Sequence, residues 1–143
     1  MTVQQISVFL ENKAGRMAAA AAALKDGGIN IRVLTIAENE RYGVLRMIVN
    51  DPDKATDVLK NGGFMAKQNP IIAVEVADKV GIMHDIMQLC DTENVNIEYM
   101  YSFVEQMSNR AILFLRFEDT DAAAAMFVKN GYKLLSSDEV CKI

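Results

Sequence analysis

The chain has 143 residues, of which 51% are hydrophobic and 24% charged, so it has enough apolar side chains to bury a core and is not disordered. Its 15 Lys and Arg residues against 19 Asp and Glu residues give a net charge of -4, which argues against a protein that mainly binds nucleic acid. No apolar run reaches the roughly 18 residues of a membrane-spanning helix, and the first residues lack the pattern of a signal peptide, so we expect a cytoplasmic protein with no membrane partner.

The first half of the chain predicts six elements in a fixed order. Ile6, Val8 and Leu10 alternate along a predicted strand. A helix follows, and its predicted inner stripe has the spacing i, i+3, i+4, i+7: Met17, Ala20, Ala21 and Leu24. Two strands over residues 29–37 and 42–49 then surround a polar turn.

A second helix and a short strand complete this unit. Asp51 or Asp53 can cap the helix, and Gly62-Gly63 ends it. Its predicted inner face consists of Ala55, Val58 and Leu59.

The second half of the chain repeats the same order. The segment from Ile72 to Met83 aligns with the segment from Ile6 to Met17 at an offset of 66 residues, and later segments align at an offset of 68. The shift falls in the polar stretch between the two middle strands, which predicts a longer hairpin in the second copy. The predicted inner helix faces are Met83, Ile86, Met87 and Cys90, and then Ala123, Met126 and Phe127.

The two copies meet at Asn69-Pro70 with almost no linker. We therefore expect two domains, residues 1–69 and 70–143, packed side by side. The order βαββαβ predicts an α+β fold in which each ferredoxin-like unit has a four-stranded antiparallel sheet with two helices on one face.

Two strands, over residues 44–49 and 111–117, are apolar on both faces. A sheet with helices on one side and water on the other should alternate instead. We expect self-association or packing between domains to bury the second face. The alternative is that half-exposed strands tolerate apolar residues, as protein surfaces commonly do.

Two segments of the sequence resemble the opening of an ACT domain. They are ENKAGRMAAAAAALKDGGINI and ADKVGIMHDIMQLCDTENVNI, and each combines an Asn/Asp-x-x-Gly loop, a helix and an Asn-Ile entry into the second strand. The resemblance covers residues 3–68 and 71–137. It implies a module that binds a free amino acid and regulates amino-acid metabolism. Such modules are usually attached to an enzyme, and because none is recognisable in this chain, the regulated target stays open.

The corner between the first strand and the first helix has the chemistry to hold an amino acid. The first amides of a helix have no intrahelical partner and attract a carboxylate, and Gly15 and Gly81 let the backbone approach a ligand closely. Asn12 and Asp78 carry oxygens that can accept from an ammonium group. The resemblance places the other wall at the second strand of an adjacent domain, at Asn30-Ile31 and Asn96-Ile97, so the implied pocket lies at a domain seam. The candidate ligand-binding residues are Asn12, Ala14, Gly15, Arg16, Met17, Asn30, Ile31, Asp78, Val80, Gly81, Ile82, Met83, Asn96 and Ile97.

Each candidate also has a purely structural interpretation. Asn12 and Asp78 can be helix N-caps, the two glycines can serve loop geometry alone, and Asn30 and Asn96 can end the turn before a strand. Arg16 can attract a carboxylate or remain in solvent. The second copy has Ile82 at that position, so the two sites need not be equivalent.

Catalytic motifs are missing from the sequence, which has no GxSxG, HExxH or P-loop pattern. The single histidine, His84, is expected at the surface or lining the site rather than acting as a general base. Cys90 and Cys141 are isolated and form no CxxC pair, so we expect no metal, cofactor or disulfide.

These observations favour a non-enzymatic regulatory protein that senses a free amino acid at its domain interfaces. We expect it to act as a homodimer or with an amino-acid metabolic enzyme, and to have no nucleic-acid partner. The alternative is a protein-interaction subunit whose pockets have no function. Imidazole, aliphatic and aromatic ligands all stay open.

Overall fold

The computed structural model describes residues 1–105 and 108–143. By its internal contacts the chain divides into two compact units. The N-terminal unit consists of Gln4–Asn69 with Cys141–Ile143, and the C-terminal unit consists of Pro70–Val140 with Met1–Val3. Each unit therefore holds one copy of the repeat, with three residues from the opposite end of the chain.

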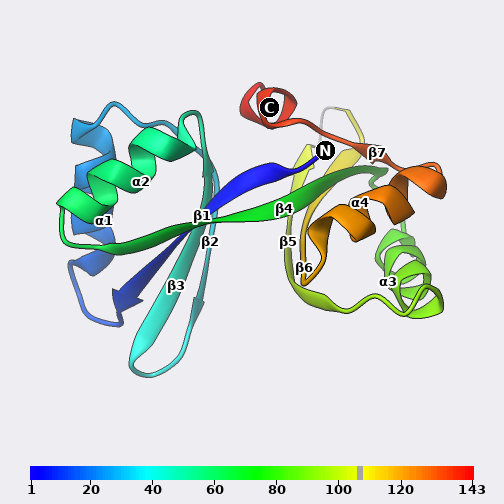
Figure 1. Cartoon of the computed structure of the whole chain (residues 1–143), viewed down its shortest axis with the longest axis horizontal. Coiled ribbons are helices and arrows are strands. Elements are labelled where there is room, and N and C mark those ends of the chain that lie inside the picture. The colour runs from blue at the N-terminus through cyan, green and yellow to red at the C-terminus, as the bar shows by residue number, and fades with distance from the viewer. Residues whose placement is uncertain (106–107) are drawn as a thin grey trace. The chain divides into compact units, whose positions relative to one another are not determined.

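The N-terminal unit has the order βαββαβ, with both helices on one side of the sheet (Figure 1). Its elements are β1 (Val3–Glu11), α1 (Arg16–Asp26), β2 (Ile31–Glu38), β3 (Tyr42–Val49), α2 (Pro52–Asn61) and the first part of β4 (Met65–Ala77). The strand order is β2-β3-β1-β4, and β3 pairs antiparallel with both of its neighbours. In this register Val8 lies opposite Leu45, and Leu34 lies opposite Met47.

The C-terminal unit repeats this arrangement. After the second part of β4 come α3 (Ile82–Thr92), β5 (Ile97–Glu105), β6 (Arg110–Phe117), α4 (Thr120–Lys129), β7 (Lys133–Leu134) and a short α5 (Ser137–Cys141). Antiparallel pairs join β4 to β7, β4 to β6, and β6 to β5. The predicted α+β fold with two ferredoxin-like units is confirmed. The predicted longer hairpin is also confirmed, since β5 ends at Glu105 and β6 begins at Arg110, whereas β2 ends at Glu38 and β3 begins at Tyr42.

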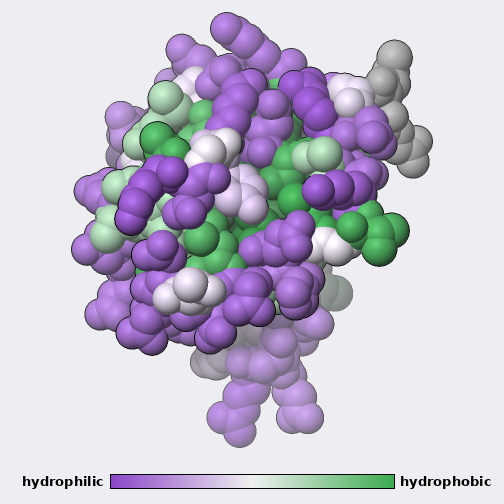
Figure 2. Space-filling view, turned by 90° about the vertical axis from the view of Figure 1, so that its right-hand side faces the viewer, coloured by the Kyte–Doolittle hydropathy of each residue, from purple (hydrophilic) through white to green (hydrophobic). Residues whose placement is uncertain are grey.

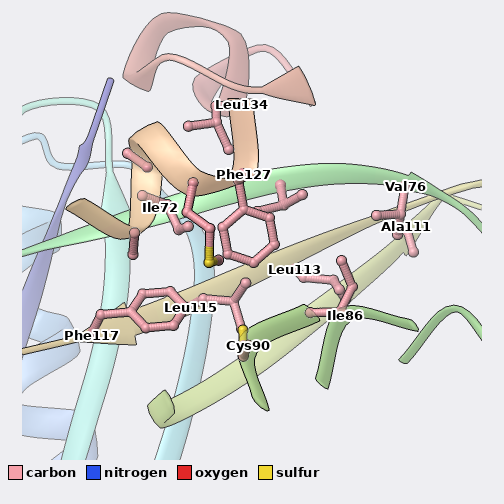
Figure 3. Packing of buried hydrophobic residues seen from close by; sticks show 14 residues of the cluster. Ile72, Val76, Ile86, Cys90, Ala111, Leu113, Leu115, Phe117, Phe127 and Leu134 are labelled. Atoms are coloured by element: carbon pink, nitrogen blue, oxygen red, sulfur yellow. The ribbon is translucent and has the colours of Figure 1, made fainter. Parts of the chain in front are cut away.

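Each unit buries a core between its sheet and its helices. In the N-terminal unit the predicted strand face of Ile6, Val8 and Leu10 is buried. In the C-terminal unit Phe127 points from α4 into the equivalent cluster (Figure 3). The predicted inner face of α4 is buried throughout, and that of α2 is buried except for the half-buried Val58.

The stripes predicted for the first helix of each copy are only partly correct. Ala20 and Leu24 of α1 are buried, but Met17 and Ala21 are exposed. The buried face turns instead toward Ala23, because Ala23 packs with Val58 of α2 against the same core. Likewise, in α3 Ile86 and Cys90 are buried, whereas Met87 is exposed.

The second face of each sheet is buried at several positions within the single chain. Ile112 and Phe114 of β6 point away from the helix-side core and are 4% and 0% exposed. The Phe114 ring stacks on Tyr101, with 5.1 Å between the ring centroids. In the N-terminal unit Ile48 is 1% exposed. Other apolar residues on the same faces are exposed, since Phe9 of β1 and Phe103 of β5 are 40% and 38% exposed.

Within residues 1–105 and 108–143, none of the helices combines the length and the apolar composition needed to cross a bilayer.

Candidate functional site

The first predicted corner lies between β1 and α1. Gly15 is the N-cap residue of α1 and has a φ of 87°, a left-handed conformation that a side chain disfavours. The Asn12 amide donates to the carbonyl of Arg41 at 2.9 Å, so the corner is fixed to the connection between β2 and β3. Inside the corner the Arg16 amide donates to the Lys13 carbonyl at 3.3 Å. The helix ladder then starts with the Ala19 amide on the Gly15 carbonyl at 2.9 Å.

The second corner, between β4 and α3, has the same backbone geometry. Gly81 has a φ of 92°, and the Ile82 amide donates to the Lys79 carbonyl at 3.3 Å. The Asp78 amide donates to the Asn109 carbonyl at 3.0 Å, which fixes this corner to the connection between β5 and β6. The 66-residue repeat seen in the sequence is therefore also a repeat of backbone conformation and hydrogen bonding.

The helices that follow the two corners begin without a side-chain cap. By contrast, the N-cap residue of α2 is Asp51, whose side chain accepts from the Lys54 amide, and that of α4 is Asp119, whose side chain accepts from the Ala122 amide. Over the described residues, the amides of Met17 and Ala18, and those of Met83 and His84, have no acceptor in the backbone. Each corner thus leaves helix-initial amides free for an anionic group.

Space is open beside both glycines. A Cβ atom added to Gly15 or to Gly81 would meet no other atom within 4 Å. The backbone at each corner can therefore be approached from outside without moving a neighbouring side chain.

The interpretation of Asn12 and Asp78 as helix N-caps is wrong, because the N-caps are Gly15 and Gly81. The Asn12 side chain instead donates from Nδ2 to the carbonyl of Asn39 at 2.9 Å, which adds a second link to the hairpin. Its Oδ1 is not used in that bond. Among the residues the structure describes, the exposed Asp78 carboxylate has no hydrogen-bond or ion-pair partner.

The Arg16 side chain is partly buried, and its surroundings differ from those of Ile82, the equivalent residue of the second copy. Its guanidinium carbon lies 5.0 Å from the centroid of the Phe64 ring, and its Nε atom is buried without a hydrogen-bond partner in the described part of the chain. Ile82, at the equivalent position, packs with Met83 against the C-terminal core. The two corners therefore agree in backbone and differ in charge. Ala14, Met17 and Val80 are exposed.

The strand-two residues lie at the other end of the first helix in each unit. Asn30 and Ile31 follow the C-terminal end of α1, and Asn96 and Ile97 follow that of α3, whereas the glycines precede these helices. Each helix has 11 residues, so the two groups are separated by about 16 Å along the helix axis. Within one unit the two groups of candidate residues therefore do not lie together.

A pocket of about 410 Å³ opens at this other end in the C-terminal unit. Asn96 is the only predicted site residue in its lining, and sequence analysis missed the rest: Glu93, Asn94, Val95, Phe117, Glu118, Asp119, Ala122, Ala123 and Met126. The repeat could have indicated this difference between the copies. Glu93 and Glu118 align with Gly27 and Asn50 of the first copy, so two acidic side chains replace a glycine and an amide at this end of the unit. In Figure 2, which faces the side where α3 and α4 lie in Figure 1, hydrophobic surface is visible between hydrophilic side chains.

Neither the histidine nor the buried cysteine is arranged for catalysis. His84 is exposed, and its Nδ1 lies 3.8 Å from an Asp85 oxygen. Burial raises the pKa of the Cys90 thiol, which disfavours the reactive thiolate. Within the described residues no three His, Cys, Asp or Glu side chains are close enough together to hold a metal ion.

Comparison with known proteins identifies similar chains. A family model described as an ACT domain pair matches residues 1–143. The crystal structure of a protein from Bacteroides thetaiotaomicron has 34% sequence identity and a TM-score of 0.92, with 100% of this chain and 98% of that chain covered. No curated protein matches the sequence.

Two more distant structures show the same fold. The ligand-free regulatory subunit of aspartate kinase from Thermus thermophilus has 18% identity and a TM-score of 0.62, with 88% of this chain and 90% of that chain covered. Aspartokinase III from E. coli, in complex with lysine and aspartate, has 15% identity and a TM-score of 0.56, with 90% of this chain and 31% of that chain covered.

Proposed function

Because the chain belongs to the ACT domain pair family, we propose that it is a regulatory protein that binds a free amino acid at its two glycine corners and catalyses no reaction. The observation that carries this proposal is the repeated corner: a left-handed glycine, uncapped helix amides and open space, in the same geometry at Gly15 and Gly81. Proteins of this fold that are named as regulatory subunits of an enzyme support a role of the same kind here.

The ligand's carboxylate is the group that fits the corner. It would accept from the amides of Met17 and Ala18 in the first copy, and from those of Met83 and His84 in the second. The partial positive charge at each helix start adds to these hydrogen bonds. The ligand's ammonium would lie beside Asn12 or Asp78, whose oxygens are available as acceptors.

We propose that the two corners bind with different strengths. Asp78 offers a full negative charge to the ammonium, whereas Asn12 offers only an amide oxygen. At the first corner the charged Arg16 is turned onto Phe64, so it adds positive potential there that Ile82 does not supply. The second corner therefore favours the ammonium end of the ligand, and the first favours the carboxylate end.

A regulatory effect requires that the ligand binds one conformational or assembly state better than another. We propose that the protein acts as a homodimer or together with an amino-acid metabolic enzyme, and that residues at Asn30-Ile31 and Asn96-Ile97 contribute from another unit. Light scattering with and without ligand tests the dimer. A monomer under both conditions would contradict it.

The alternative is a protein-interaction subunit, whose partner would cover the apolar second face of a sheet. At β6 Ile112 and Phe114 of that face are buried, whereas Phe103 of β5, which pairs with Ile112, is 38% exposed. A stoichiometric protein partner together with a silent amino-acid panel would favour this alternative.

A panel of the common free amino acids, measured by thermal unfolding and calorimetry, tests the proposal. A ligand at a hundredfold excess over its Kd stabilises the folded chain by about 2.7 kcal/mol, which is a clear shift of the melting temperature. We expect a shift with one amino acid or one chemical class of them. The absence of any shift at millimolar concentration would refute amino-acid binding.

Gly81→Val tests the location of the site. The new side chain points into the open space at the corner and should abolish binding there while the protein still folds. Gly131→Val is the matched control. Gly131 also has a left-handed φ, 82° against 92° at Gly81, and a Cβ atom added to it would also meet no other atom within 4 Å. If the two variants bind equally, the site lies elsewhere. Gly15→Val tests the first corner in the same way.

A further inference from the structure

The C-terminal unit has a pocket at a place where, in the N-terminal unit, hydrogen bonds join the equivalent connections of the same repeat. In the N-terminal unit the Asn30 amide donates to Oδ1 of Asn50 at 2.9 Å, and the Asn50 amide donates to the Asn30 carbonyl at 3.2 Å. These two bonds tie the connection after α1 to the connection after β3. The first copy is therefore closed at this end of the helix.

Close packing between the helices reinforces this closure. A Cβ atom added to Gly27 would lie only 2.8 Å from a methyl group of Val58, so α1 and α2 leave no room there. The second copy has Glu93 in place of Gly27 and Met126 in place of Val58. Both replacements line the pocket of about 410 Å³.

The hydrogen bonds that close the first copy have no counterpart in the second. Glu118 stands where the first copy has Asn50, and in the described residues no hydrogen bond joins it to Asn96. The connections after α3 and after β6 are therefore separate. The pocket lies between them, beside the start of α4.

The lining of this pocket combines an apolar floor with a negative rim. Phe117, Ala123 and Met126 are buried and form its floor. The rim carries three carboxylates, from Glu93, Glu118 and Asp119, and the lining includes no Lys, Arg or His. One oxygen of Asp119 caps α4 through the Ala122 amide. The positive end of the helix is thus already matched by an acidic side chain, which leaves the rim negative.

A ligand for this pocket needs both positive charge and an apolar part. A metal ion is disfavoured, because in the described residues no three acidic side chains converge closely enough to hold one. The volume is within the range of about 300–1,000 Å³ that is usual for small-molecule sites. We propose that the pocket binds an aliphatic ammonium compound, with its methylene groups on Phe117 and Met126 and its charged group at the carboxylate rim.

The site is independent of the glycine corners and does not rest on the function proposed for them. The corners need a carboxylate on the ligand, whereas this pocket repels one. A linear diaminopentane carries two ammonium groups and no carboxylate, so its binding reports on the pocket alone. Lysine, which carries both kinds of group, distinguishes a free amine from a basic amino acid as the natural source of the ammonium.

Calorimetric titration with diaminopentane at low ionic strength is the first measurement. We expect saturable binding that weakens as salt is added, because the rim charges are exposed and screened. Pentanediol, of the same length without charge, should not bind. The absence of diaminopentane binding at millimolar concentration would overturn the proposal, and so would equal binding of the diol. Neither result would bear on amino-acid binding at the corners.

Three variants locate the binding. Glu93→Gln and Glu118→Gln should each weaken it by about two- to fivefold, as expected for the loss of one exposed charge pair. Asp57→Asn, at an exposed position in α2, changes the net charge equally and should leave affinity unchanged. Uniform weakening by all three would indicate attraction by net charge rather than a site, and would contradict the proposal.

Glu118→Asn gives the sharpest result, because it installs the residue that closes the first copy. Its amide oxygen should accept from the Asn96 amide as Asn50 does from Asn30, and close the pocket. We expect a loss of about tenfold or more, beyond that of Glu118→Gln, with an unchanged circular dichroism spectrum. Equal affinity in the two Glu118 variants would show that the opening does not bind the ligand.

Discussion

The N-terminal unit joins the connections at the far end of α1 by two hydrogen bonds between Asn30 and Asn50, whereas the C-terminal unit leaves a pocket at the same place. At the near end of the helix the two units are alike, with Gly15 and Gly81 only 5° apart in φ, at 87° and 92°. The near end depends on backbone conformation, which only glycine adopts easily. The far end depends on individual side chains, so a few replacements are enough to open it.

The two cores differ in a related way. The C-terminal core contains an aromatic group in which the rings of Phe117 and Tyr132 flank Phe127, at centroid distances of 6.1 and 5.5 Å. The repeat places Val49, Leu59 and Phe64 at the equivalent positions of the N-terminal core. The same backbone therefore holds a mainly aliphatic core in one unit and a more aromatic one in the other.

The largest expected effect comes from Phe127. Phe127→Ala should lower the free energy of unfolding by about 3–5 kcal/mol, because it removes a fully buried ring and leaves a cavity. Phe127→Leu, which installs the residue of the first copy, should cost clearly less. Urea denaturation followed by circular dichroism measures both. Equal losses would mean that apolar volume does not explain the contribution of Phe127, because leucine restores most of that volume.

A smaller effect distinguishes the capped helices from the uncapped ones. Asp51→Ala and Asp119→Ala should each cost about 1 kcal/mol, because each removes the acceptor for a helix-initial amide. Asp57→Ala, on the exposed side of α2, is the control and should cost less. Thermal unfolding gives the comparison. If the control is as costly as Asp51→Ala, helix propensity rather than capping explains the loss.

The smallest effect separates the two hairpins by their response to pH. The Ser108 hydroxyl and the Arg110 guanidinium both hydrogen-bond to the Glu105 carboxylate and lower its pKa below the ordinary value of 4.5. A lowered pKa in the folded state contributes stability above the unfolded pKa, and that stability is lost as the pH falls through the folded pKa. Glu105→Gln should therefore reduce stability slightly at pH 7 and not at all at strongly acidic pH.

Asn39 provides the comparison in the first hairpin. Its Oδ1 accepts from the amides of Arg41 and Tyr42, and no charge is involved. Asn39→Ala should therefore cost the same at acidic and neutral pH. NMR titration of the Glu105 carboxyl checks the cause directly, since Arg110→Ala should raise its pKa. An unchanged pKa in that variant would refute the assignment.

Much of the fold could be predicted because the repeat reports every local pattern twice. The strand face of Ile6, Val8 and Leu10 and the helix end at Gly62 were predicted and are confirmed. Of the two candidate caps of α2, Asp53 and Asp51, the structure has Asp51 at the N-cap. The ACT resemblance is confirmed by the family match. The ligand-binding roles of Gly15 and Gly81 stay predictions.

Side-chain partners were predicted less well. Asn12 was expected to cap a helix or to contact a ligand. It caps no helix, its side-chain amide donates to the carbonyl of Asn39, 27 positions away, and its role toward a ligand stays a prediction. Arg16 was expected to attract a carboxylate or to remain in solvent. Its guanidinium lies on Phe64, and its role toward a ligand stays a prediction. The partners in both cases come from elements distant in sequence, which local spacing does not report.

The amino-acid sequence by itself determined the order of elements, the two copies and the glycine corners. Each of these depends on residues within one or two turns of each other, or on a backbone conformation that one residue type adopts. Only the tertiary structure decided which stripe of α1 is buried and whether the far end of each first helix is closed or open. Those outcomes depend on whether a side chain such as Asn50 or Glu118 hydrogen-bonds to the connection that precedes the second strand of its unit. That connection lies 20 residues before Asn50 in the sequence, and only the folded chain brings the two together.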